Sequence, residues 1–157
     1  VRARPGTRRG REGTAAGGPL RFGRRTYQDF ASFWPHQKDN PFTPVLDNAL
    51  KYVASRTPIE PLEWQNSTVL KGDLAEAVLA LKQEDGGDLH VIGSSELVRS
   101  LLAHDLVDEF RVMIDPLLLG GGKRIFLDDG ALRRLRLLDS QVTTTGALLA
   151  TYAIDRG

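Results

Sequence analysis

Apolar residues recur at helical spacing in three stretches of the chain. The first helix is predicted to begin at Thr26, with Asp29 as its capping-box partner, and to end before Pro35. The second is predicted to begin after Asp73, a residue type that caps helix N-termini well. The third follows Gly93-Ser94-Ser95 directly and turns its leucine and valine side chains inward.

Short apolar or alternating runs between and after these helices predict strands. The runs lie at residues 52–54, 67–70, 89–92 and 108–115, and a hairpin that turns near Thr145-Gly146 is expected between residues 132 and 154. Strands that alternate with helices, followed by a terminal hairpin, are typical of the α/β fold class. We therefore expect an α/β protein with a mostly parallel central sheet and an antiparallel C-terminal hairpin.

The first 20 residues have a different composition from the rest of the chain. Residues 1–25 hold eight arginines and a single acid, Glu12, and residues 1–20 contain almost no large apolar side chain. Such a segment buries too little apolar surface to offset its ordering entropy. We therefore predict a disordered segment over residues 1–21 and one domain over residues 22–157. A misplaced gene start is an alternative, and a nucleic-acid-binding tail is disfavoured because no aromatic residues are interleaved to stack on bases.

Composition narrows the classes of protein further. The 157 residues are 41% hydrophobic and 26% charged, as in an ordinary soluble globular domain. The absence of cysteine excludes disulfides and thiolate chemistry, and the three histidines lack ligand spacing, so no metal site is expected. No apolar run approaches the ~18–20 residues of a membrane span, which makes a cytoplasmic location the default expectation and a membrane partner unexpected.

Three short polar segments carry the candidate chemistry. They are Gly23-Arg24-Arg25-Thr26, Ser55-Arg56-Thr57 and Gly93-Ser94-Ser95. The third joins a strand directly to a helix, so that backbone N–H groups and the positive end of a helix dipole face a ligand such as phosphate. Taken singly, each segment has an ordinary alternative as a helix start or a solvated turn.

Taken together and in this order, the three segments resemble the NADPH-binding elements of the dihydrofolate reductase-like fold. They are most similar to the reductase domain of the bifunctional riboflavin-biosynthesis deaminase–reductase and its stand-alone bacterial relatives. The segment from Pro116 to Phe126, with its glycines and basic residues, strengthens the similarity. The resemblance covers about Phe22 to Ala153.

The resemblance implies that each of the three segments contacts a different part of NADPH. Gly23, Arg24, Arg25 and Thr26 would contact the adenosine phosphate end of NADPH, and Ser55 and Arg56 its 2′-phosphate. The pyrophosphate would lie on Gly93, Ser94, Ser95, Glu96 and Leu97. The implied activity is NADPH-dependent reduction of a small heterocyclic or carbonyl substrate by a homodimer. The closest implied reaction is that of 5-amino-6-(5-phosphoribosylamino)uracil reductase, with folate-type reduction second.

The chain also departs from this family. Its members begin with a buried apolar strand and a loop near the nicotinamide and the substrate, and residues 1–20 contain no such apolar run. We therefore expect the first strand to be missing, and no catalytic proton donor can be named beyond two candidates, Asp115 and Lys123. A non-catalytic, truncated nucleotide-binding remnant of the family is the alternative function.

Overall fold

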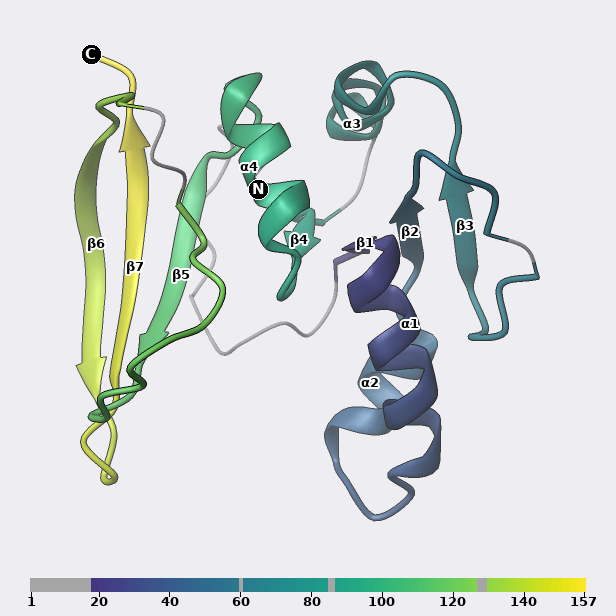
Figure 1. The fold of residues 1–157 in the computed structure, drawn as a ribbon, viewed down its shortest axis with the longest axis horizontal. Helices are drawn as coiled ribbons and strands as arrows, with labels where there is room; N and C mark the ends of the chain where they lie inside the picture. Colours follow the sequence, from purple (N-terminus) through teal and green to yellow (C-terminus); the bar gives the residue numbers. More distant parts are fainter. Residues whose placement is uncertain (1–17, 60, 85–86, 127–129) are drawn as a thin grey trace.

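The computed structural model describes residues 18–59, 61–84, 87–126 and 130–157 (Figure 1). Its elements are, in chain order, β1 (Leu20–Gly23), α1 (Arg24–Phe33), the 3-10 turn η1 (Trp34–His36), α2 (Phe42–Asn48), β2 (Lys51–Ala54), β3 (Ser67–Leu70), α3 (Leu74–Gln83), β4 (His90–Val91), α4 (Ser95–Ala103), β5 (Glu109–Ile114), β6 (Arg134–Val142) and β7 (Leu148–Asp155). None of the helices in these ranges is long and apolar enough to cross a membrane.

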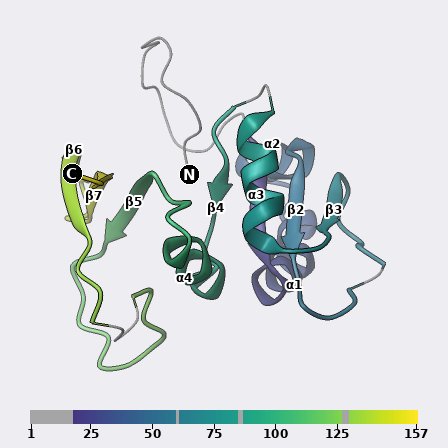
Figure 2. The same ribbon diagram turned by 90° about the horizontal axis from the view of Figure 1, so that it is seen from above.

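The strands form two sheets. Four parallel strands lie in the order β3-β2-β1-β4, and three antiparallel strands lie in the order β5-β7-β6. The predicted α/β class, with a parallel sheet and an antiparallel C-terminal hairpin, is confirmed. Within the described ranges β4 pairs only with β1 and β5 only with β7, so the two sheets are separate, with α4 between them (Figures 1 and 2).

The predicted domain boundary after residue 21 is wrong, because it falls inside β1. Leu20, Arg21 and Phe22 are buried, and β1 is a central strand that pairs with β2 on one side and β4 on the other. The local pattern gave no sign of this strand, because an arginine interrupts its short apolar run. Residues 1–17, the rest of the segment predicted to be disordered, lie outside the described residues.

The predicted helix starts are partly correct. Asp73 caps α3 as expected, since its Oδ1 accepts hydrogen bonds from the N–H groups of Ala75 at 2.9 Å and Glu76 at 3.0 Å. The predicted cap at Thr26 is wrong. Helix α1 begins at Arg24, its N-cap is Gly23, and no side chain caps it.

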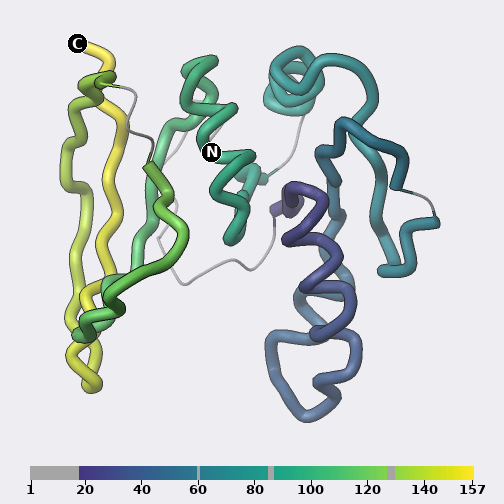
Figure 3. The backbone as a smooth tube through the Cα atoms, in the orientation of Figure 1, coloured from purple at the N-terminus to yellow at the C-terminus, as the bar shows by residue number. Residues whose placement is uncertain are grey.

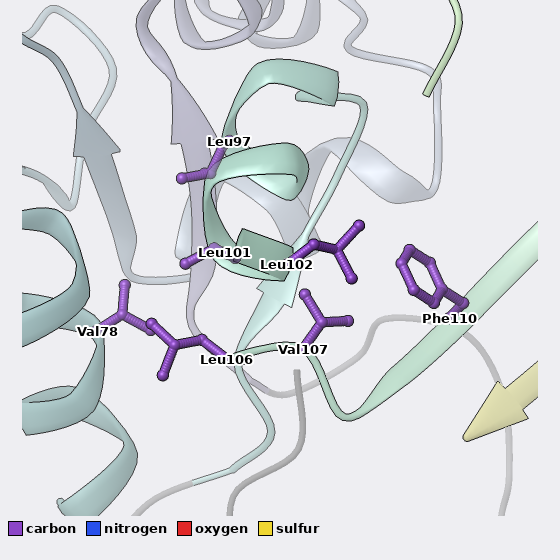
Figure 4. Close-up of a cluster of buried hydrophobic side chains, with 7 residues drawn as sticks. All are labelled: Val78, Leu97, Leu101, Leu102, Leu106, Val107 and Phe110. Carbon is purple, nitrogen blue, oxygen red and sulfur yellow. The ribbon is translucent and has the colours of Figure 1, made fainter. Parts of the chain in front are cut away.

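The parallel sheet separates two hydrophobic clusters. One packs Leu20 and Phe22 of β1 against Tyr27 and Trp64. The other is built from α3, α4 and the chain leading into β5 (Figure 4); its buried members are Val78, Leu97, Leu101, Leu102, Leu106, Val107 and Phe110. Val91 of β4 and Tyr152 of β7 pack on this second cluster from the two sheets. Helix α4 therefore joins the sheets through apolar contacts.

Lys51, the first residue of β2, is a buried cation whose three donors are all used. Its Nζ donates to the carbonyl oxygens of Asp47, Ala49 and Gln65 at 3.0, 2.9 and 3.0 Å, and it lies 4.5 Å from the centre of the Trp64 ring. Burial lowers the pKa of Lys51 to about 8, and the Asp47 carboxylate opposes that shift. The ammonium thus connects the end of α2 to the loop before β3.

Replacing this ammonium should destabilise the domain. Lys51→Met removes the ammonium donor from three carbonyl groups, of which that of Asp47 keeps the side-chain amides of Gln65 and Asn66 as donors. We expect the free energy of unfolding to fall by about 2–4 kcal/mol. Urea denaturation of the purified protein measures the change. Lys38→Met, at an exposed loop position, is the matched control and should change stability by less than about 0.5 kcal/mol. Equal stability of the two variants would contradict the structural role of Lys51.

Candidate functional site

The three polar segments meet at one edge of the parallel sheet. Strands β2, β1 and β4 are neighbours and run parallel, and Gly23 lies opposite Ala54 in the register. Residues 24–26 and 55–57 directly follow β1 and β2, and residues 93–95 follow β4 after Ile92. Open α/β sheets bind ligands at this edge. Tertiary structure therefore gathers the segments that the sequence could only place in order.

A hydrogen bond ties the first of these segments to the third. The backbone N–H of Gly23 donates to the Ser94 hydroxyl oxygen at 2.9 Å, and that hydroxyl in turn lies 3.4 Å from the Ile92 carbonyl oxygen, to which it donates. Ser94 is buried and occupies the N-cap position of α4, but its side chain caps no N–H of its own helix. The turn after β1 and the turn after β4 are thereby held together.

The consequence appears in the first turn of α4. The backbone N–H groups of Glu96 and Leu97 donate a hydrogen bond to no acceptor among the described residues. Such unpaired donors, together with the positive end of the helix dipole, form a site for an anion. An anionic group such as a phosphate therefore fits here, and the donors that meet it are backbone groups.

Gly93 permits the sharp turn into this helix. Its φ of +65° is strained for residues with a side chain, and a Cβ placed there would lie 3.5 Å from Thr26 Cγ2. The turn after β4 and the first turn of α1 therefore lie next to each other. Ser95 continues this turn, and its N–H donates to the Gly93 carbonyl at 3.2 Å.

The second segment adds cationic groups. Arg24 Nη1 donates to Thr57 Oγ1 at 3.0 Å, which connects α1 to the loop after β2. Ser55 Oγ donates to the Thr57 carbonyl at 2.6 Å and shapes this loop. The Arg25 and Arg56 side chains are exposed, and neither forms a hydrogen bond or ion pair with a described residue. They are available to a phosphate-bearing ligand.

The remaining predicted residues lie in different environments. The Leu97 side chain is buried in the core, so only its backbone can face a ligand. The Glu96 side chain is 86% exposed and pairs with Arg99. Asp115 is exposed and follows β5 in the other sheet, so the fold does not bring it to the carboxyl edge formed by β2, β1 and β4. Lys123 is exposed in the loop that Arg99 contacts.

Two buried or half-buried basic groups lie nearer the amino ends of the strands. Arg21 is 1% exposed; its Nη1 donates to the Pro19 carbonyl at 3.3 Å, and its Nε and Nη2 have no hydrogen-bond partner among the described residues. Burial lowers the pKa of Arg21 to about 10, against the opposing effects of Tyr52 and Glu84. Burial also lowers the pKa of His90, and the positive charge of Arg111 adds to that shift. Among the described residues, no group of three or more histidine or acidic side chains is placed to hold a metal.

The two sheets and their helices form an α/β domain of the dihydrofolate reductase-like fold. The sequence profile of the RibD C-terminal domain matches residues 22–149. The chain therefore belongs to the RibD C-terminal domain family.

Similar proteins support this assignment. The uncharacterised Bacillus subtilis protein YyaP is 28% identical over 136 residues, which cover 83% of this chain and 71% of YyaP. A structure of a candidate riboflavin biosynthesis protein from Shewanella sp. PV-4 superposes with a TM-score of 0.73 at 25% identity, over 89% of this chain and 75% of that one. Dihydrofolate reductase from Enterococcus faecalis, solved with NADP(H), shares the fold with a TM-score of 0.58 at 16% identity, over 87% and 74% of the two chains.

Removing the Ser94 hydroxyl should weaken the connection between the two turns. Ser94→Ala leaves the Gly23 N–H without this acceptor in a buried position, and we expect a loss of about 1–2 kcal/mol in the free energy of unfolding. Urea denaturation measures it. Ser140→Ala, on exposed β6, is the control and should stay within about 0.5 kcal/mol of the wild type. A Ser94→Ala variant as stable as this control would contradict the role of the bond.

His90 should make stability depend on pH. Its pKa is lowered from 6.5 in the folded protein, so as the pH falls below about 6.5 the unfolded chain binds a proton that the folded chain does not. Stability that is present above that pH is then lost on acidification. Chemical denaturation at two pH values on either side of 6.5 should show a larger loss for the wild type than for His90→Gln. Equal losses would contradict this assignment.

Proposed function

We propose that this domain binds NADPH at the carboxyl edge of the parallel sheet and catalyses reduction of a small heterocyclic or carbonyl substrate. The observation that carries the proposal is the Gly23–Ser94 hydrogen bond. It holds two turns together while the N–H groups of Glu96 and Leu97 remain without acceptors among the described residues. This arrangement suits the pyrophosphate of a dinucleotide.

The rest of the edge suits the other charged part of the same cofactor. Ser55 and the exposed guanidinium of Arg56 follow β2, the strand next to β1, and would contact a ribose 2′-phosphate. Residues 23–26, with Arg24 tied to Thr57, would support the adenosine phosphate end. When bound, the nicotinamide supplies the hydride, and the residues of this chain bind and orient the cofactor.

The substrate class is proposed from the family. A pyrimidine reductase-like protein from Corynebacterium diphtheriae shares the fold, with a TM-score of 0.57 at 15% identity over 90% of this chain and 77% of that one. An aminouracil of the 5-amino-6-(5-phosphoribosylamino)uracil type is the first substrate to test, and a pterin is the second. Asp115 and Lys123 are the candidate polar groups on the substrate side, and water can supply the proton in their place. A homodimer and a cytoplasmic location belong to the same proposal.

One observation favours a second candidate function, a nucleotide-binding domain without catalysis. Within the described residues no strand pairs with both β4 and β5, and both candidate substrate-side groups are exposed to solvent. A domain of this kind would bind NADPH at the parallel sheet and would not reduce a substrate.

Titration of the purified protein with NADPH and, separately, with NADH tests the cofactor site. Binding can be followed by the fluorescence of Trp34 and Trp64. We expect saturable binding of NADPH in preference to NADH. Arg56→Gln should weaken NADPH binding about tenfold or more, because it removes a charge-assisted contact to the 2′-phosphate, and should leave NADH binding unchanged. Arg136→Gln, on exposed β6, is the matched control and should bind NADPH as the wild type does.

A second measurement separates the two candidate functions. Oxidation of NADPH in the presence of the aminouracil or pterin substrate supports the reductase. Saturable NADPH binding with no turnover of either substrate favours the non-catalytic domain. A folded chain that binds no NADPH would contradict both.

A further inference from the structure

Residues 115–126, here termed the cationic loop, connect β5 toward β6 and are almost entirely exposed. The loop contains Gly120, Gly121 and Gly122, and a Cβ at the first two of these would meet no atom within 4 Å. Its own backbone contributes only short-range bonds, such as that from the Leu117 N–H to the Asp115 carbonyl at 2.8 Å. The loop therefore depends on contacts with the rest of the protein for its position.

Within the described residues, every hydrogen bond that joins the cationic loop to another element comes from one side chain, that of Arg99 on α4. Its Nε donates to the Ile125 carbonyl at 3.2 Å and its Nη2 to the Arg124 carbonyl. Phe126 adds an edge-on ring contact with Phe110 of β5, with the ring centres 5.7 Å apart. The loop consequently lies beside α4 and β5 (Figure 3).

The third donor of Arg99 is fixed from its own helix. Nη1 donates to Glu96 Oε1 at 3.1 Å, one turn earlier in α4. The side chain of Arg99 is 21% exposed, whereas that of Glu96 is 86% exposed, so the ion pair mainly orients the guanidinium. A planar guanidinium can reach three acceptors in three directions at once, and a lysine ammonium on a flexible stem cannot reproduce that fork.

Arg99 links the cationic loop to the first turn of α4. Lys123 and Arg124 are exposed, and the Arg124 carbonyl is anchored on a side chain that is itself held at Glu96. Glu96 and Leu97 supply the backbone N–H groups that lack acceptors at the start of α4. The loop that carries these two cations is therefore connected, through Arg99, to the turn of α4 that holds these N–H groups.

We propose that Arg99 is a positioning residue that clamps the cationic loop against α4, and that Lys123 thereby adds its charge to the phosphate site at the start of that helix, in place of the substrate-side role considered above. The clamp itself stands on the three hydrogen bonds of Arg99. Its effect on nucleotide binding rests on the proposed function. Arg99 acts through the loop and makes no contact with the ligand.

Trypsin tests the clamp without reference to activity, because it cleaves after Lys123 and Arg124. Appearance of the new N-termini at Arg124 and Ile125 can be followed by mass spectrometry on the full chain. We expect Arg99→Lys to be cleaved there about fivefold faster or more, since local opening becomes easier when the anchoring bonds are lost. Arg136→Lys on exposed β6 is the matched control and should be cleaved at the wild-type rate. Equal rates for all three proteins would overturn the proposal.

Arg99→Gln serves as a second variant, and thermal unfolding shows whether both variants remain folded. Glu96→Gln should raise the cleavage rate less than Arg99→Lys does, because Arg99 retains both of its bonds to the loop. A larger effect of Glu96→Gln than of Arg99→Lys would contradict the assignment of the clamp to the carbonyl contacts.

A double-mutant cycle on NADPH affinity tests whether Arg99 affects NADPH binding through Lys123. Arg99→Lys and Lys123→Gln should each weaken binding several-fold, and the double variant should bind no more weakly than Lys123→Gln alone. If the fold-losses of NADPH affinity in the two single variants multiply in the double variant, Arg99 does not act through Lys123. If the wild-type protein binds no NADPH, the proposed function and the ligand role of the clamp both fail, and the cleavage rates still decide whether Arg99 holds the loop.

Discussion

The arrangement of the candidate site depends on one hydrogen bond between residues 71 positions apart, from the Gly23 N–H to the Ser94 hydroxyl. Two βα turns that begin in separate parts of the chain are joined by it at the same edge of the sheet. The serine that would ordinarily cap its own helix is used to make this connection, and the first turn of α4 keeps donors without acceptors among the described residues. Structural cohesion and the capacity to bind an anion therefore have the same origin.

Helix α4 serves three purposes through three parts of its surface. Leu97, Leu101 and Leu102 pack into the cluster that joins the two sheets. The backbone of its first turn faces the candidate ligand, and Arg99 holds the cationic loop. Because the sheets do not share a hydrogen-bonded strand in the described residues, these contacts of α4 carry much of their connection.

The two buried cations of the parallel sheet differ in how many of their N–H groups have an acceptor. Lys51 has a carbonyl acceptor for each of its three protons and a ring face beside it. Arg21 has one carbonyl and the Tyr52 ring, and two of its nitrogens have no hydrogen-bond partner in the part of the chain that the structure describes. Unsatisfied buried donors reduce stability, so Lys51 contributes more than Arg21 does to holding the sheet together.

Local sequence determined the elements whose signals are short-range. The alternation over residues 108–115 specifies β5, and Asp73 specifies the start of α3. The three polar segments, through their family resemblance, predict a nucleotide-binding edge. Only the tertiary structure decided that Leu20–Gly23 is a central strand despite Arg21, that Ser94 bonds to Gly23, and that Arg99 reaches Arg124. The physical reason is the separation along the chain. Periodicity and capping act over a few residues, whereas a side chain's partner 25 or 71 positions away is fixed by packing, which no local pattern specifies.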